Sequence, residues 1–558
     1  MFFRLKATGP YQYLQIAESL RVDGKVRQRI LATLGRLDVL QESGQLDSLL
    51  RSGLRFSNKL AVLDAHADGR TQPAQVLSIG PDLVFGRLWV ECDIQAVLRE
   101  ALVGRHFEFD VERAIYLTVL HRLVQPGSDR AAETWRQNYR IPGTENLALH
   151  HLYRAMAWLG EELDEGSELK DVSRCTKDLV EEALFHRDQD LFGGIDLVFF
   201  DTTSIYFEGA GGQSLGRHGF SKDHRPDLRQ MVVGAALDVK GRPICSLLWP
   251  GNITDSKAVM PLIHRLQKRF RVRRVSLVAD RGMISHELIE ALESESIQCG
   301  YILGVRMRST AEVHQKVLTD TAPWAELEAE RERSTDPSPL KVKEVRVDGR
   351  RYVVCLNEEQ RRKDAADREA IVKSLRERLG KGGADKELIG NSGYRKFVKV
   401  RGEAHYEIDE AKIESEAKYD GIWVLRTNLD LENELVARTY KHLWTVEDTF
   451  RTMKTVLSTR PIYHKNDDTI RGHVFCSFLA LRLRHELEQR LEGLGKPWEW
   501  GEVIRGIDKL QEVTLGFENR TYAMRSELTG QIGLAIKAAR VALPPTLREV
   551  PPEPPLKV

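Results

Sequence analysis

The sequence predicts a mixed α/β fold in which helices cover a mixed sheet. Two apolar segments each have the pattern of a buried strand with an aspartate at its carboxyl end, Asp201 in one and Asp280 in the other. Between residues 192 and 306, three strand-like segments are followed by alternating strand and helix patterns. A third acid, Glu447, lies in a segment with the three-four apolar spacing of a helix. Acids at the carboxyl ends of neighbouring strands are expected to share one cleft.

The chain begins with a segment that we assign, as residues 1–75, to a small module containing β-strands. Strand-like patterns cover 2–7, 11–21 and 25–37, and a turn is expected at Asp23-Gly24. Several arginines and lysines permit contact with nucleic acid, although a basic hairpin is more often only a soluble one.

Residues 76–190 change to helical patterns. Three-four apolar spacing occurs at 111–123, 147–159 and 173–184, and Pro126-Gly127 interrupts it. These patterns predict a helical domain.

The remaining chain divides into a core, an insertion and a tail. We assign 191–306 to the first part of the catalytic core and 426–540 to its second part with C-terminal helices. The alternation stops at 307, so 307–425 is predicted to be a mostly β insertion. The proline-rich segment 541–558 is predicted to be disordered.

The three acids indicate a functional site only if the fold brings Asp280 and Glu447 close to Asp201. A carboxylate at the end of a rigid strand suits a metal ligand or a general base. Taken alone, Asp201 equally suits the start of a turn. In the helical segment 435–457, a polar stripe borders the apolar face. Its members are Tyr440, Glu447, Arg451 and Lys454.

Composition excludes some classes of protein. The net charge of the 558-residue chain is +1, so the average charge does not indicate a polyanion partner, although local basic clusters exist. We find no apolar run that would span a bilayer and no signal-peptide pattern, so we expect a cytoplasmic protein without a membrane partner. The six cysteines show no paired spacing typical of zinc sites or disulfide frameworks.

Several motifs together resemble the DDE transposases of bacterial insertion sequences, in which a ribonuclease-H-like core is interrupted by a β insertion. The N-terminal stretch from Asp23 to Gln28 is similar to the insertion-sequence-1634 subgroup. The resemblance covers about 192–490. The matching motifs are Phe199 to Thr203, Gly219 to Asp227, Pro250 to Asp255, Val278 to Gly282 and Tyr440 to Lys454.

The family's last motif has Tyr, Arg, Glu and Lys at fixed spacing, and one position departs from it. Tyr440, Glu447 and Lys454 match, but Leu443 stands where the family has Arg. The catalytic Glu of the motif is still present. The contact that the family's Arg makes with a DNA phosphate is not expected from Leu443. Arg451, one turn beyond Glu447, could partly replace it.

The resemblance implies a chemistry and a set of site residues. Asp201, Asp280 and Glu447 would be catalytic and would hold two Mg²⁺ ions, for which Mn²⁺ can substitute. Asp201 would bridge both ions. The implied DNA-binding residues are Tyr440, Arg451, Lys454, Lys222, Arg225 and Arg281. For the helical domain of residues 76–190, the resemblance implies a role in DNA binding or dimerisation.

The implied activity is cleavage of DNA at terminal inverted repeats and joining of the 3′ ends to target DNA, by a homodimer assembled on DNA in the bacterial cytoplasm. A non-catalytic DNA-binding descendant and a structure-selective nuclease of the same fold are the alternatives. The glycine-rich segment 211–218 lacks the Lys-Ser/Thr ending of a nucleotide-binding loop. Asp223, Asp227 and Asp255 are spare acids that could equally be caps or turns, and we leave them out of the catalytic set. Trp324 is a weak candidate for base stacking, whereas Trp423 suits core packing.

Overall fold

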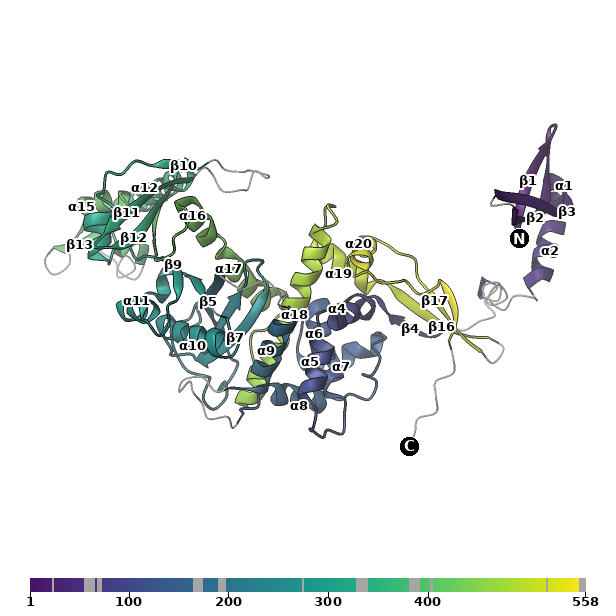
Figure 1. The fold of residues 1–558 in the computed structure, drawn as a ribbon, viewed down its shortest axis with the longest axis horizontal. Coiled ribbons are helices and arrows are strands. Elements are labelled where there is room, and N and C mark those ends of the chain that lie inside the picture. The colour runs from purple at the N-terminus through teal and green to yellow at the C-terminus, as the bar shows by residue number, and fades with distance from the viewer. Residues whose placement is uncertain are drawn as a thin grey trace.

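A computed structural model describes most of the chain (Figure 1). The described residues are 1–22, 25–54, 66–67, 73–163, 174–188, 197–272, 275–327, 340–380, 392–401, 405–517 and 520–550. The turn predicted at Asp23-Gly24 lies outside them.

The N-terminal module is an antiparallel three-stranded sheet with two helices. The strands pair in the order β1-β2-β3, and α1 packs against β2 and β3. The elements are β1 (Phe2–Thr8), β2 (Tyr11–Val22), β3 (Lys25–Arg36), α1 (Leu37–Glu42) and α2 (Gln45–Leu54).

A group of helices follows and packs on the long helix α18 (Asp467–Glu492). The closest crossing is with α8, where a side chain at Gly472 of α18 would collide with the Met156 carbonyl. The group comprises η1 (Asp82–Gly86), α4 (Arg87–Glu91), α5 (Ile94–Ala101), α6 (Val111–Val124), α7 (Asp129–Trp135), η2 (Arg136–Asn138), α8 (Leu149–Gly160) and α9 (Thr176–Asp188).

The central element is a nine-stranded mixed sheet in the order β10-β11-β12-β15-β9-β8-β5-β6-β7. Strands β5, β8 and β9 run parallel and the other pairs are antiparallel. The strands are β5 (Leu197–Tyr206), β6 (Gln230–Leu237), β7 (Pro243–Pro250), β8 (Ser276–Ala279), β9 (Gly300–Gly304), β10 (Ala325–Leu327), β11 (Leu340–Val347), β12 (Arg350–Asn357) and β15 (Ile422–Thr427).

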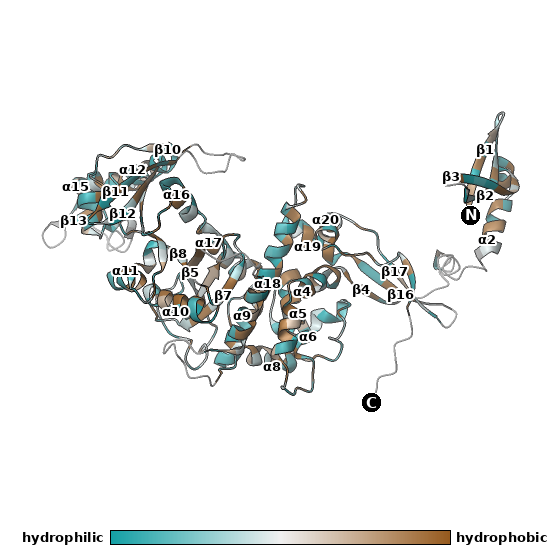
Figure 2. Cartoon of the chain, viewed as in Figure 1, coloured by the Kyte–Doolittle hydropathy of each residue, from teal (hydrophilic) through white to brown (hydrophobic). Residues whose placement is uncertain are grey.

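Helices cover both faces of the β5–β9 region because its strands are apolar on both sides. Phe200 and Leu277 pack with α10 (Asp255–Lys268) and α11 (His286–Glu293). On the other face, Phe199 and Val278 join the core that contains α18. Strands β5 and β7 appear mainly hydrophobic in Figure 2.

The region predicted as a mostly β insertion differs from that prediction. Its strands β11, β12 and β15 extend the central sheet rather than forming a separate one. It also contains the 23-residue helix α12 (Glu358–Gly380), which is longer than any of its strands and largely hydrophilic. Its other elements are η4 (Val313–Val317), α14 (Ser392–Arg395), β13 (Val398–Arg401), β14 (His405–Ile408) and α15 (Glu410–Ala417).

The single helix predicted for 435–457 is divided. Helix α16 (Asn433–Lys441) ends before His442, and α17 (Trp444–Arg451) continues into the π-helical turn η5 (Thr452–Val456). Leu443 lies at the break and is buried in the core.

The C-terminal region contains strands as well as the predicted helices. A four-stranded sheet in the order β18-β17-β16-β4 joins the end of the chain to residues near position 75. Because β18 lies inside 541–558, the prediction of disorder is wrong for Leu547–Val550. The elements are α19 (Trp500–Asp508), β16 (Gln511–Phe517), β17 (Arg520–Arg525), α20 (Ile532–Ala538), β18 (Leu547–Val550) and β4 (Pro73–Ser78).

None of the described helices combines the length and apolar character that crossing a membrane requires. The six cysteines are free thiols.

Candidate active site

Asp201 lies in the middle of strand β5, not at its end as we predicted. The strand continues to Tyr206 because β6 pairs with it from Phe199 to Tyr206, with Asp201 opposite Ala235. Its carboxylate accepts a 2.7 Å hydrogen bond from the N–H of Thr202, and the side chain is 18% exposed. Asp201 is therefore held by a rigid element yet remains accessible.

Asp280 lies beside Asp201. Strands β5 and β8 run parallel with Phe200 paired to Ala279, and each aspartate is the residue that follows this pair in its own segment. Strand β8 ends at Ala279, and Asp280 begins the turn that contains η3 (Arg281–Met283). The expected meeting of these two acids is thus observed.

A third aspartate, Asp255, joins this group, although we left it out of the predicted catalytic set. It opens helix α10, and the Thr202 hydroxyl donates to its Oδ1 at 2.6 Å. Burial raises the pKa of Asp201 to about 6, and the charges of Asp280 and Asp255 add to the increase. A signal was present in the motif from Pro250 to Asp255, but local pattern did not distinguish a site residue from a helix start.

Lys222 is the cation of this acidic group. Its Nζ lies 3.4 Å from Asp255 Oδ2 and 3.8 Å from Asp201 Oδ1, and it donates to the Thr202 carbonyl at 2.7 Å. We predicted a DNA contact for Lys222. In this structure its ammonium group instead faces the carboxylates.

The side chain of Tyr440 on helix α16 extends into the same site. Its hydroxyl donates to Asp280 Oδ1 at 3.0 Å. The approach is possible because Gly304 has no side chain: a Cβ there would collide with the hydroxyl. Burial, followed by the charge of Asp280, raises the pKa of Tyr440, so the phenol stays protonated and donates.

Glu447 is exposed in the first turn of α17. Its charge acts on Tyr440, where it contributes to the raised pKa of the phenol. Within the described ranges, Asp201, Asp280 and Glu447 do not form a group whose ligand atoms all lie within 4.8 Å; Asp129, His464 and His473 do. The structure thus brings two of the three predicted acids together and places Glu447 near their tyrosine partner.

The other predicted DNA-binding residues fall into two groups. Lys454 is internal: it bonds Asp223 at 2.7 Å, their side chains are 9% and 6% exposed, and Arg460 lies 2.5 Å from the same carboxylate. Burial lowers the pKa of Lys454. Arg451 pairs with Asp448 and is 73% exposed.

Arg225 and Arg281 are also exposed. Arg225 pairs with Asp227 at 2.8 Å, and the Arg281 carbonyl accepts a 3.1 Å hydrogen bond from Arg306. These two arginines and Arg451 are thus exposed to solvent, and Arg225 and Arg451 each pair with an aspartate.

The glycine-rich segment does not offer a free phosphate cradle. The N–H groups of Gln213 and Ser214 donate to the carboxylate of Asp467, at 3.0 and 2.9 Å. The Asp467 carboxylate therefore occupies the N–H groups that would bind a phosphate, which argues against a nucleotide-binding role for this loop.

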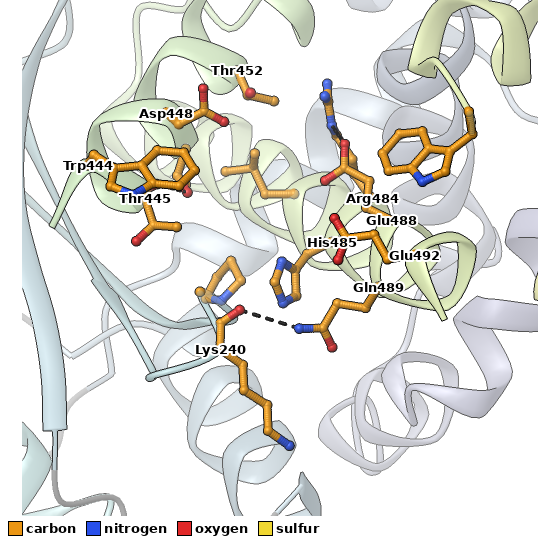
Figure 3. A pocket seen from close by; sticks show the side chains of 15 residues that line it. Lys240, Trp444, Thr445, Asp448, Thr452, Arg484, His485, Glu488, Gln489 and Glu492 are labelled. Atoms are coloured by element: carbon orange, nitrogen blue, oxygen red, sulfur yellow. Dashed lines mark hydrogen bonds and ion pairs between the residues drawn. The ribbon is translucent and has the colours of Figure 1, made fainter. Parts of the chain in front are cut away.

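A pocket of about 350 Å³ lies between α17 and α18 (Figure 3). Trp444 and Asp448 of α17 line it, opposite His485 and Glu488 of α18. Gln489 donates to the Lys240 carbonyl at 3.4 Å across its lower edge. Burial raises the pKa of Glu488. None of the three predicted acids lines this pocket.

Comparison with known families defines the class of protein. Residues 192–483, more than half of the chain, match the transposase DDE domain, so the chain belongs to the DDE transposases, enzymes of DNA cleavage and strand transfer. Residues 4–67 match the N-terminal domain of IS1634 family transposases, so the N-terminal module is similar to that of this particular family. Membership implies DNA binding and divalent metal ions.

A comparison with curated proteins found no match. Among solved structures, the cryo-EM structure of a piggyBac transposase synaptic complex with hairpin DNA is similar at 11% identity, with a TM-score of 0.34. The similarity covers 83% of this chain and 80% of that one.

Proposed function

We propose that the protein binds the terminal inverted repeats of an insertion sequence, cleaves the DNA by metal-dependent hydrolysis and joins the 3′ ends to target DNA. The observation that supports this most directly is the adjacency of Asp201 and Asp280 on parallel strands, with Tyr440 bonded to Asp280. The mixed sheet that carries them is consistent with a ribonuclease-H-like core.

Asp201, Asp280 and Glu447 are the proposed catalytic residues and would hold two Mg²⁺ ions, with Mn²⁺ as a substitute. The donor set fits, because carboxylates are the hard oxygen ligands that magnesium prefers. Burial, and to a smaller extent the charges of Asp280 and Asp255, raises the pKa of Asp201, and a bound cation would favour its ionised form. When bound, such ions supply activation of the attacking oxygen and stabilisation of the leaving oxygen.

The surrounding side chains orient the carboxylates of the site. Tyr440 fixes Asp280 through one hydrogen bond, and the Thr202 hydroxyl fixes Asp255. Lys222 partly balances Asp201 and Asp255 while no other cation does. Each contact reduces the freedom of a carboxylate before DNA arrives, which favours catalysis by preorganisation.

Exposed cations would bind the phosphates of the DNA ends. We assign this role first to Arg225, Arg281 and Arg451, because they face solvent. Lys222, Tyr440 and Lys454 would have to leave Thr202, Asp280 and Asp223 to make such contacts. Two DNA ends processed together call for a homodimer on DNA, in the bacterial cytoplasm at the nucleoid.

The decisive experiment measures cleavage of a labelled duplex that carries the inverted repeats flanking the gene. We expect cuts at the repeat boundary in Mg²⁺, none after EDTA, and none from Asp280→Asn. Binding without cleavage in both Mg²⁺ and Mn²⁺ would favour a non-catalytic descendant. Cuts set by DNA shape and independent of the repeat would favour a nuclease.

A further inference from the structure

A pocket of about 570 Å³ lies between helix α9 and the end of α10, and its lining is strongly basic. Four of its side chains carry a permanent positive charge: Arg174, Lys268, Arg269 and Arg271. The one acid of the described lining, Glu182, is already paired with Arg174 at 2.6 Å, and these side chains are only 10% and 19% exposed. The pocket thus keeps an excess of positive charge.

Arg269 is the cation of this pocket that most requires an anion. It is half-buried, and no ion pair joins it to a carboxylate in the part of the chain that the structure describes. Burial, followed by the charge of Arg174, lowers the pKa of Arg269. Removing a charge from water without a partner costs free energy, and a bound anion would offset that cost.

The turn that presents these cations is held in place. The N–H groups of Arg269 and Phe270 both donate to the Arg265 carbonyl, at 2.9 and 3.2 Å. The ring of Phe270 is fully buried and meets the ring of Phe185 on α9 edge-on, with 4.9 Å between centroids. His186 Nε2 lies 3.4 Å from the Arg269 carbonyl. A turn fixed before binding lowers the entropy cost of holding a ligand.

The helix dipole explains only part of this arrangement. Cations near the C-terminus of a helix are stabilised by the carbonyl groups that end there, and Lys268 lies in the last turn of α10. Arg174, however, precedes α9 and comes from a different part of the chain. Its charge opposes that of Arg269, so the dipole of α10 does not account for their meeting in one pocket.

We propose that this pocket binds a phosphate group, at a site separate from the carboxylates around Asp201. Phosphate suits the lining because the N–H groups of a guanidinium match the spacing of its oxygens. Helix α10 separates the two sites: Asp255 opens the helix, and Lys268 ends it after 14 residues. A helix of this length spans about 20 Å, so the two sites hold different phosphates.

Two sources of phosphate share this chemistry. One is the DNA backbone about six base pairs from the bond that is cleaved, since B-form DNA advances about 3.4 Å per base pair along each strand. This source rests on the proposed function. The other is a free phosphate compound, whose binding does not depend on cleavage.

The first measurement is the affinity of the full chain for a duplex without the inverted repeats, at several salt concentrations in EDTA. Arg269→Gln and Arg271→Gln should each bind about tenfold more weakly at low salt. The slope of log affinity against log salt should fall by about one, because one phosphate contact is lost.

Arg540→Gln is the matched control for Arg271→Gln. Arg540 is also exposed and also has a left-handed backbone just beyond a helix, with φ 53° against 55° for Arg271. It does not line the basic pocket. The control should bind the duplex as the native chain does.

The second measurement is thermal unfolding with pyrophosphate, without DNA or metal. Pyrophosphate should raise the unfolding temperature of the native chain and of Arg540→Gln more than that of Arg269→Gln. Without pyrophosphate, Arg269→Gln should be at least as stable as the native chain, because it removes a charge that Arg174 repels. A weaker response of this variant is then not a folding defect.

The two measurements distinguish the sources. Lower duplex affinity and a lower salt slope in the pocket variants would identify the DNA backbone. A smaller response to pyrophosphate with native duplex binding would identify a free phosphate compound. Native behaviour of both pocket variants in both measurements, or equal losses in Arg540→Gln, would overturn the proposal.

Failure of this proposal is distinguishable from failure of the proposed function. Neither measurement requires cleavage, and Asp280→Asn should behave as the native chain in both while losing cuts. A native protein that cuts at the repeats, with pocket variants that bind duplex and pyrophosphate as it does, would refute only the phosphate site.

Discussion

The hydroxyl of Tyr440 donates a 3.0 Å hydrogen bond to Asp280 Oδ1, through space that Gly304 leaves open. The bond joins helix α16 to the end of strand β8. It makes the orientation of one proposed metal ligand depend on a helix far along the chain.

Tyr440→Phe should lower the rate of Mg²⁺-dependent cleavage by roughly tenfold to a hundredfold, because a hydrogen bond to a charged group contributes about 1.5–3 kcal/mol. Binding of the DNA duplex should change little. Gly304→Ala should reproduce the defect by displacing the tyrosine. Native rates in both variants would show that Asp280 needs no such support.

Lys222→Met should bind Mn²⁺ about tenfold more tightly in the absence of DNA, measured by the paramagnetic resonance of free Mn²⁺. The reason is that the ammonium group lies 3.4–3.8 Å from two carboxylates and competes with any other cation. Arg451→Met, which removes an exposed cation from α17, is the control and should bind Mn²⁺ as the native protein does. Equal affinities in the two variants would contradict the competition.

His473 should make the protein sensitive to acid. Burial lowers its pKa from 6.5 to about 4, with Arg122 2.9 Å from its Nδ1 and the Thr459 carbonyl 3.1 Å from its Nε2. Between pH 6.5 and 4 the unfolded chain therefore binds the extra proton, and stability falls as pH falls, by up to roughly 3 kcal/mol.

The measurement is the free energy of unfolding in urea at several pH values. His473→Asn should be less stable at pH 7 but should lose less stability on acidification. His121, whose pKa burial also lowers to about 4, should keep part of the dependence in the variant. If the free energy of unfolding of His473→Asn depended on pH as strongly as that of the native protein, His473 would not be the cause of the pH dependence.

Gly472→Ala should destabilise the protein by about 1–3 kcal/mol, because the added methyl group would collide with the Met156 carbonyl where α18 crosses α8. Gly533→Ala in α20 is the matched control, since a Cβ there meets nothing within 4 Å, and a helical alanine is favoured over glycine. Thermal unfolding of both variants checks the contrast. Equal losses of stability in the two variants would mean that α18 and α8 move apart enough to accommodate the added methyl group.

Local pattern predicted much of this protein. The apolar run before Asp280, the turn at Gly282 and the helix that follows are encoded by neighbouring residues, and the structure contains them at these positions. The order of acids and motifs was sufficient to indicate the family, which the matches confirm.

Features that depend on distant partners were missed. Asp201 lies inside its strand because β6 pairs beyond it, and β4 finds its partner β16 more than four hundred residues away. The strands β11, β12 and β15 join the central sheet by backbone pairing, which leaves no periodic signal of its own in the sequence.

By itself, the sequence determined the class of enzyme, because residue type and spacing carry that information, and it predicted Asp201, Asp280 and Glu447 as the catalytic acids. Only the tertiary structure decided that Asp255 and Lys222 join Asp201, and that Tyr440 and Lys454 make internal bonds. The physical reason is that hydrogen bonds and ion pairs depend on distance in space, whereas sequence patterns report only the neighbours along the chain.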